Sequence, residues 1–287
     1  MAVLMVWQAI FPAPEPFVPE SPGPEVSAPI PEPAPVPLAA PTAVPTPSDP
    51  LAAPSPEVPA VAAAEIIIRL TDEHRVIGLS SHGARLVEAK MSAYREPGTD
   101  PERPIVDLVP AGAKGFGGLK AKGLAIDAAY RVVEQSVRHA AFEVQVGRTV
   151  LRRTWTLSAT GLTHRIDVSG GPAPAEMTLF LEMMDPTTGG GIFAGLPDLT
   201  RALCHDGEDL EAYYASDLDP VEKAEKEPFF VGVDRNYFGA FWMGLKGTSC
   251  RGEKVDYGDE RVGVAMAVTL GDNPSNESQL LLMPKGS

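Results

Sequence analysis

The sequence predicts one all-β domain preceded by a segment without regular secondary structure. Three observations indicate this: 18 of the 30 prolines lie within the first 59 of the 287 residues, short runs of β-branched and aromatic residues recur from residue 65 onward, and Gly, Asn and Pro separate these runs. Proline lacks an amide donor and fixes φ, so the first segment cannot build helices or sheet ladders. About 220 residues remain, and closely spaced strands over this length favour one large sandwich over two small domains.

Residues 1–11, MAVLMVWQAIF, are apolar except for Gln8. A membrane span needs about 20 apolar residues, so this stretch is too short to cross a bilayer alone. A signal peptide is one interpretation, but the stretch has no basic start and no small-x-small cleavage site after it. A disordered hydrophobic start is a second. We favour a third, a partial N-terminal transmembrane anchor with Trp7 at the membrane interface.

Residues 12–64 form a predicted Pro-rich disordered spacer. The first 59 residues hold six acidic residues and no Lys or Arg, and so supply 6 of the 14 net negative charges of the chain. At about 3.1 Å per residue, a polyproline segment of this length could reach on the order of 100 Å. Positive charge retains loops in the cytoplasm, so an apolar anchor followed by an acidic spacer fits a domain displayed on the other side of a membrane.

Residues 65–287 form the predicted β domain. Alternation is clearest in the strand 162–169, where Leu162, His164 and Ile166 share one face and Thr163 and Arg165 the other. Thirteen short strands are predicted, at 65–70, 76–79, 84–89, 105–109, 130–133, 141–146, 149–157, 162–169, 177–184, 229–233, 237–245, 262–270 and 279–283.

The densest part of the core is predicted at Phe229–Gly244, FFVGVDRNYFGAFWMG, which holds six aromatic residues. Aromatic side chains bury the most surface, so two buried strands are expected here, separated by a turn at 234–236. Residues 197–227 are acidic and weakly helical, and we expect a solvated surface excursion. The preceding Gly189-Gly190-Gly191 lacks the Lys-Ser/Thr of a phosphate loop and is interpreted as a turn.

The sequence contains no recognisable catalytic or metal-binding motif. Cys204 and Cys250 are too few for a disulfide framework or a zinc site, although they could pair in an oxidising compartment. His164 lies on the apolar face of its strand, where a core histidine is expected. Arg152 and Arg153 lie on opposite faces, and a solvated sheet surface explains at least one of them. We therefore predict no catalytic, cofactor-binding or metal residue, which is typical of a binding or scaffold module.

A net charge of −14 without a basic cluster argues against nucleic-acid binding.

The order of these parts resembles the first, periplasmic domain of the YidC family of membrane protein insertases. The apolar start and Pro-rich segment match that family's anchor and spacer. The hairpin from Ile66 to Glu96 carries Gly83, Leu86 and Tyr94 at the corresponding places. The most specific match is the Gly-x-x-x-x-Tyr-Phe signature formed by Gly232, Tyr237 and Phe238. The segments 150–169 and 280–287 are similar to a mid-domain strand pair and to the closing strand.

This resemblance implies a twisted β-supersandwich related in shape to galactose mutarotase, with no catalytic role. It further implies a bacterial inner-membrane anchor, a periplasmic β domain, and work with the Sec translocon, including SecD-SecF, on nascent membrane proteins. The transmembrane insertase core has no counterpart in this sequence.

Two other functions remain open. A mutarotase-like carbohydrate-active protein needs a general acid and base on either side of a sugar ring, and the candidates are His164 or His139 with Glu143 or Glu182. A periplasmic or cell-surface adhesion module on a Pro-rich stalk is the other.

Overall fold

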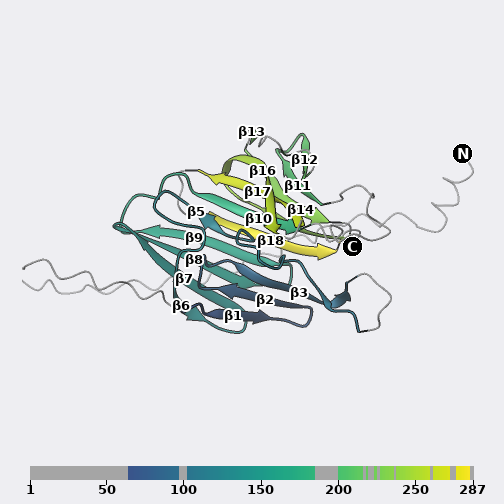
Figure 1. The fold of residues 1–287 in the computed structure, drawn as a ribbon. Helices are drawn as coiled ribbons and strands as arrows, with labels where there is room; N and C mark the ends of the chain where they lie inside the picture. The colour runs from purple at the N-terminus through teal and green to yellow at the C-terminus, as the bar shows by residue number, and fades with distance from the viewer. Residues whose placement is uncertain are drawn as a thin grey trace, which may run out of the picture. The chain divides into compact units, whose positions relative to one another are not determined.

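The computed structural model describes residues 64–96, 102–184, 200–215, 218, 223–224, 227–235, 237–258, 261–271 and 276–284. Within these ranges the secondary structure consists of eighteen β-strands and no helix (Figure 1). The prediction of an all-β domain is therefore confirmed. The predicted anchor, residues 1–11, and residues 12–63 of the predicted spacer lie outside the described residues, as does the predicted turn at Gly189–Gly191.

A four-stranded sheet comes first in the chain. Its strands are antiparallel and follow chain order: β1 (Ile67–Thr71), β2 (Arg75–Ser80), β3 (Leu86–Arg95) and β4 (Ile105–Asp107).

A nine-stranded antiparallel sheet is the largest element. Its spatial order is β12 (Leu210–Tyr214), β11 (Arg201–His205), β14 (Phe230–Arg235), β15 (Phe238–Met243), β18 (Asn276–Pro284), β9 (Leu162–Ser169), β8 (Thr149–Leu157), β7 (His139–Val146) and β6 (Arg131–Gln135).

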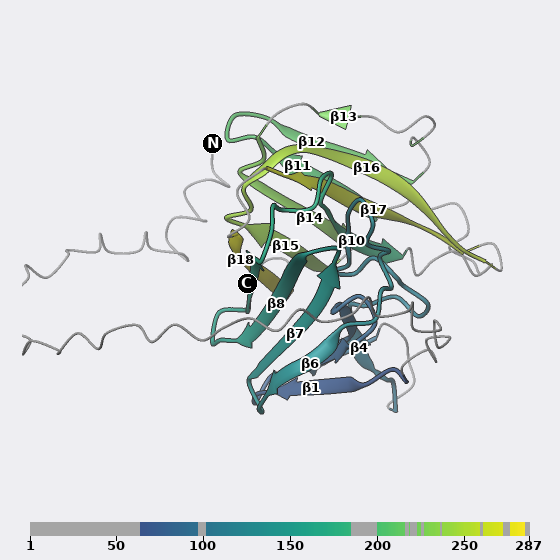
Figure 2. The same cartoon turned by 90° about the vertical axis from the view of Figure 1, so that its left-hand side faces the viewer.

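A five-stranded sheet completes the fold. Its order is β13 (Lys223–Ala224), β16 (Gly247–Gly258), β17 (Arg261–Leu270), β10 (Thr178–Met184) and β5 (Leu119–Lys120). Figure 2 shows β16 and β17 over the β11–β14 part of the large sheet, whereas β1 lies near β6. Two smaller sheets thus cover different parts of one long sheet.

The core lies on the inner face of the nine-stranded sheet. Strand β8 shows why: Leu151, Arg153, Trp155 and Leu157 alternate with less buried residues, because successive side chains of a strand point to opposite faces. Trp155 is fully buried and its Nε1 donates to Ala84 O, next to β3, at 2.9 Å. This contact ties the large sheet to the start of the domain.

Two sequence-based expectations are wrong. The supposed excursion at 197–227 contains β11, β12 and β13, and β11 lies between β12 and β14 with Ala202 and Cys204 buried. The supposed turn at 234–236 is also misplaced, because Asp234 and Arg235 belong to β14. In both cases pairing with neighbouring strands overrides local propensity.

Candidate functional site

His164 is a core residue, as its strand position predicts. It has no exposed surface, and its ring stacks on Trp155 with the centroids 4.1 Å apart. The Arg153 guanidinium donates to His164 Nε2 from Nε (3.1 Å) and from Nη2 (3.0 Å). Burial, and secondly the charge of Arg153, hold the pKa of His164 well below its usual value. The ring is therefore neutral, and its accepting nitrogen is already engaged.

Arg153 is the buried charge at the centre of this cluster. It donates to Gly83 O at 2.8 Å and to Gly117 O at 2.7 Å, and its guanidinium carbon lies 5.3 Å from the Trp155 ring centroid. Burial lowers the pKa of Arg153 to about 10, so it remains protonated at neutral pH. The Arg153 side chain therefore joins two loop carbonyls to the large sheet.

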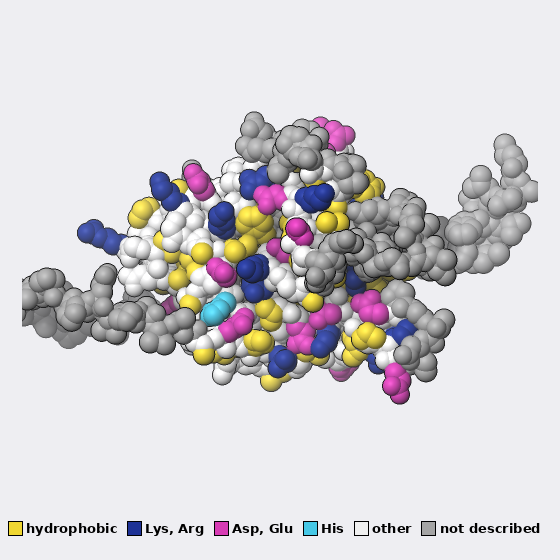
Figure 3. Space-filling view, in the orientation of Figure 1, with side chains coloured by type: hydrophobic (Ala, Val, Ile, Leu, Met, Phe, Trp, Pro, Cys, Tyr) yellow, Lys and Arg dark blue, Asp and Glu magenta, His cyan; other side chains and the backbone are white. Residues whose placement is uncertain are grey.

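His139 lies on the opposite, outer face, in a network of ion pairs. Its Nε2 is 3.0 Å from Glu134 Oε2, and Arg152 bonds both Glu134 (2.6 Å) and Glu143 (3.4 Å). The hydrogen bond from Arg152, followed by that of His139, lowers the pKa of Glu134. Figure 3, which looks onto the side of the domain that carries β1–β3, also shows acidic and basic side chains interspersed over a sheet surface. Such a network is typical of a solvated sheet face.

Glu182 belongs to the five-stranded sheet. It is 7% exposed and accepts a hydrogen bond from Tyr257 Oη at 3.1 Å. A Cβ placed on Gly115 would lie 2.1 Å from Glu182 Oε1, so the carboxyl group fills the space that a side chain at 115 would need. Burial raises the pKa of Glu182, against the hydrogen bonds from Tyr257 and from the amides of Gly115 and Lys114. The carboxyl group holds the loop before β5.

The four candidate residues do not converge. His164 is inside the core, His139 and Glu143 are outside it, and Glu182 is on another sheet. Among the described residues no hydrogen bond or ion pair joins either histidine to Glu143 or Glu182. His139 does meet a carboxylate, Glu134, but at direct hydrogen-bond distance, which leaves no room for a sugar ring between them.

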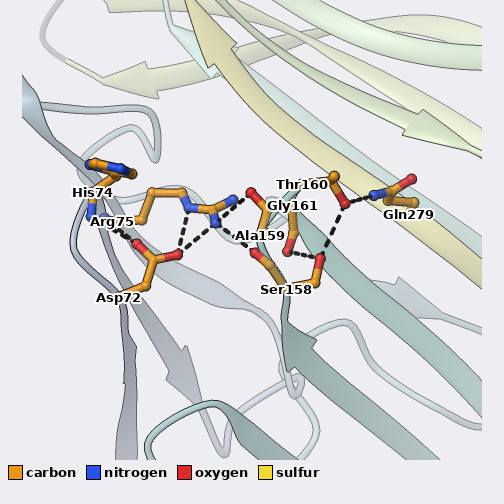
Figure 4. Close-up of polar contacts among 8 residues, drawn as sticks. All are labelled: Asp72, His74, Arg75, Ser158, Ala159, Thr160, Gly161 and Gln279. Atoms are coloured by element: carbon orange, nitrogen blue, oxygen red, sulfur yellow. Dashed lines mark hydrogen bonds and ion pairs between the residues drawn. The ribbon is translucent and has the colours of Figure 1, made fainter.

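A buried ion pair fixes the turn between β8 and β9 (Figure 4). Arg75 is 6% exposed, pairs with Asp72 at 2.6 Å, and donates to Ser158 O at 2.6 Å. From the other side Gln279 Nε2 donates to Thr160 Oγ1 at 2.6 Å. The turn is therefore held by groups from β2 and β18, which makes it a rigid margin of the large sheet.

The Gly-x-x-x-x-Tyr-Phe stretch has a packing role on the outer face. A Cβ on Gly232 would lie 2.5 Å from Phe241 Cδ1, and one on Gly239 would lie 2.4 Å from Phe241 Cε2. The Phe241 ring therefore covers both glycines across β14 and β15. Tyr237, which follows β14, is 68% exposed. The glycines thus let an aromatic ring lie flat against the sheet.

Next to Phe241, six outward-facing residues follow one another across six strands. We call them the outer row: Leu210, His205, Phe230, Met243, Gln279 and Thr163, each opposite the next in the strand register. His205 stacks on Phe230 with the rings 5.0 Å apart and nearly parallel. The neighbouring Phe229 is 60% exposed.

Two surface pockets meet in the middle of the outer row. One, of about 440 Å³, is lined by Phe229 and Met243 among others, and one of about 520 Å³ extends to Thr160 and Thr163. Both are lined by Met243 and Gly244, so they are neighbours, and we refer to the two together as the groove. Our sequence analysis missed this groove. The signal was present, since Phe241 and Met243 alternate with inward-facing Trp242, but it required knowing which face is buried.

Cys204 and Cys250 form a disulfide between β11 of the nine-stranded sheet and β16 of the five-stranded sheet. Both cysteines are buried. The bond therefore crosses the sandwich, and it resolves the open question of whether these cysteines pair.

Within the described residues, no helix is both long and apolar enough to span a membrane, and no three His, Cys, Asp or Glu side chains are grouped as metal ligands would be.

The curated relatives of this chain are described as membrane protein insertases YidC. One, from Anaeromyxobacter sp. (strain Fw109-5), is 30% identical over 197 residues, which is 61% of this chain and 36% of the relative. Another, from Anaeromyxobacter sp. (strain K), is 32% identical over 115 residues, covering 38% of this chain and 21% of the relative. The chain thus spans about a third or less of these proteins. No protein-family model matches the chain.

Among solved structures, the chain resembles a galactose mutarotase-like protein from Lactobacillus casei. The TM-score is 0.52 at 12% sequence identity, and the match covers 76% of this chain and all of the other. This similarity concerns the fold alone, and it confirms the predicted mutarotase-like supersandwich. The chain is thus an all-β supersandwich with weak sequence similarity to insertases of the YidC type.

Proposed function

We propose that this chain is a non-catalytic, periplasmic β domain of a YidC-type insertase. In this role it assists the insertion and folding of inner-membrane proteins together with the Sec translocon, with SecD-SecF as the partner subunits. The observation that carries the proposal is the sequence similarity to YidC insertases over 61% of the chain. Residues 1–11 are proposed to contribute the inner-membrane anchor, and residues 12–64 the spacer.

The disulfide supports a location outside the cytoplasm. Disulfides form and persist in oxidising compartments such as the bacterial periplasm, whereas cytosolic thiols are kept reduced. Cys204 and Cys250 are bonded and buried, so the bond belongs to the interior of the fold.

The positions of the two candidate histidines, His164 and His139, support a non-catalytic role. A general base must reach the proton that it abstracts. His164 is fully buried and accepts from Arg153, and His139 is paired with Glu134. Neither ring is placed to act across a bound sugar.

Co-purification tests the partner. An affinity-tagged chain is expressed in a Gram-negative bacterium, crosslinked in the cell and purified from detergent-solubilised membranes. SecD and SecF are expected to be enriched over a control in which the same tag and anchor carry an unrelated periplasmic domain. Equal recovery from both would contradict the proposal and would favour an adhesion module.

Thiol trapping tests the compartment. Cells are quenched in acid and treated with a maleimide-polyethylene glycol reagent, which adds mass to each free cysteine. We expect no mass shift without prior reduction, and two additions after reduction. Two additions without reduction would place the domain in a reducing compartment.

Polarimetry tests the carbohydrate-active alternative, which the fold similarity suggests. The protein is mixed with freshly dissolved α-glucose or α-galactose, and optical rotation is followed with time. We expect the rate observed in buffer alone. Acceleration proportional to protein concentration, abolished in a His139→Ala variant, would replace our proposal with an enzymatic one.

A further inference from the structure

We propose that the outer row, with Phe229 and Phe241 beside it, docks an apolar polypeptide segment flanked by Lys or Arg. This inference deepens the proposed function and rests on it, because it assigns the client segment a chemistry and a place on the domain.

The first argument is the composition of the surface. Phe229 is 60% exposed and Leu210 54% exposed, and Phe230, Phe241 and Met243 are partly exposed around them. Soluble proteins seldom leave such side chains contiguous, and where they do the patch commonly marks an interaction site. Aromatic residues and Met are also enriched at protein interfaces. The inner face of the same strands is closed, with Val231 and Trp242 at 1% exposure.

The second argument is shape. The two pockets that make up the groove are lined by three residues of the outer row, Met243, Gln279 and Thr163, and by Phe229 beside it. Six residues on adjacent strands leave five spacings of about 4.8 Å, so the row extends over about 24 Å. A helix rises about 1.5 Å per residue, so about 16 residues would cover that length. Two polar residues, Gln279 and Thr163, end the row, whereas its centre is apolar.

The third argument is charge. The margins of the groove carry more acidic than basic residues: Asp206, Glu208, Asp209, Glu227 and Glu277 against Lys246 and Arg165. Glu208 and Glu227 are exposed. An acidic margin favours a segment with cationic flanks through complementary potentials. It also disfavours a surface of anionic lipid, and a second copy of this acidic chain, as occupants.

Peptide binding tests the inference. The full chain is titrated into a fluorescent 16-residue Leu/Ala peptide with two Lys at each end, and into a matched peptide with two Glu at each end. Fluorescence anisotropy is expected to show tighter binding of the Lys-flanked peptide, with an affinity that falls as salt rises. Equal affinity for both peptides, or no binding of either, would overturn the inference.

Variants locate the binding. Phe229→Ser and Met243→Gln are expected to weaken binding at least about fivefold, as loss of a central apolar contact does. Val137→Ser is the matched control, because Val137 is 65% exposed but lies in the β6–β7 hairpin. The charge-reversing pair Glu208→Lys and Glu227→Lys is expected to remove the preference for Lys flanks. An equal effect of Val137→Ser and Phe229→Ser would contradict the placement, provided that circular dichroism shows both variants folded.

Two further measurements exclude other occupants. If Phe229→Ser converts a dimer to a monomer in sedimentation, the surface joins two copies of the chain and our inference is wrong. If phosphatidylglycerol vesicles bind the wild type but not Phe229→Ser, and displace the peptide, the surface is a lipid contact instead.

Failure of this inference is distinguishable from failure of the proposed function. Enrichment of SecD-SecF without peptide binding would overturn only the docking surface. Peptide binding without that enrichment would overturn the proposed function and leave a peptide-binding surface.

Discussion

Arginine and histidine occur on both faces of the nine-stranded sheet, but they are buried on the inner face and solvent-accessible on the outer face. On the inner face Arg153 bonds His164, and neither has exposed surface. On the outer face Arg152, its neighbour in the chain, joins Glu134, which also bonds His139. A buried group is worth far more than an exposed one, because lost hydrogen bonds inside the protein are not replaced by water. Contacts that determine the structure should therefore lie on the inner face of the sheet, and surfaces that bind partners should lie on the outer face.

The largest expected effect separates the two arginines. Arg153→Met should lower the free energy of unfolding by about 3 to 5 kcal/mol, because it leaves Gly83 O, Gly117 O and His164 Nε2 buried without a donor. Arg152→Met should change it by less than about 1 kcal/mol, as is usual for exposed ion pairs. Urea unfolding followed by tryptophan fluorescence measures both. Similar losses for the two variants would break the comparison between the faces.

The next effect concerns the inner face of β11. Replacing both cysteines by alanine should lower the free energy of unfolding by about 2 to 4 kcal/mol, because the unfolded chain is no longer constrained by a bond across 46 residues. Guanidinium unfolding with and without reductant checks this. The reductant should lower the midpoint for the wild type and leave the double variant unchanged. A wild type indifferent to reductant would show that the bond contributes nothing.

A smaller effect is expected on the outer face, under Phe241. Gly232→Ala should cost about 1 to 3 kcal/mol, because its Cβ would lie 2.5 Å from the Phe241 ring and 2.8 Å from Ala240 O. Gly271→Ala is the control, since its Cβ would meet nothing closer than 3.5 Å. Thermal unfolding of both variants checks the difference. Equal melting temperatures would mean that Phe241 moves aside without cost.

The smallest effect is a pH dependence from His164. Its folded pKa lies well below 6.5, so its contribution is present above the unfolded pKa and is lost as pH falls below it. The part of the unfolding free energy due to His164 should fall by about 1.4 kcal/mol from pH 7.5 to pH 5.5.

The matched variant for this prediction is His164→Gln, which keeps an acceptor for Arg153. Urea unfolding of both proteins at the two pH values gives the difference. If both lose the same stability on acidification, His164 is not the group responsible.

Much of the fold follows from local pattern. The strands around Trp155 and His164 were expected at 149–157 and 162–169, and the structure places them at Thr149–Leu157 and Leu162–Ser169. In Thr149–Leu157 buried and less buried residues alternate strictly, because one face of the sheet is covered and the other is not. The burial of His164 followed from the same alternation. Strand β16 was missed, since its Gly, Lys, Glu and Asp residues have low β-propensity and are held by pairing with β17.

The groove and the disulfide could not be predicted in this way. The outer row takes its six residues from six strands, so no segment of the chain contains it. Cys204 and Cys250 belong to different sheets, and their pairing depends on how those sheets are layered. The acidic character of 197–227 suggested a solvated excursion, whereas β11 is covered on both edges by β12 and β14.

The sequence by itself determined that the part of the domain described by the structure is all-β and that His164 is inside. These properties depend on side-chain periodicity and residue chemistry, which act within a few residues of each other. Only the tertiary structure decided which arginine is buried, whether the two cysteines join, and which aromatic residues face outward. Those outcomes depend on strand order and register, since a shift of one residue moves every side chain to the opposite face.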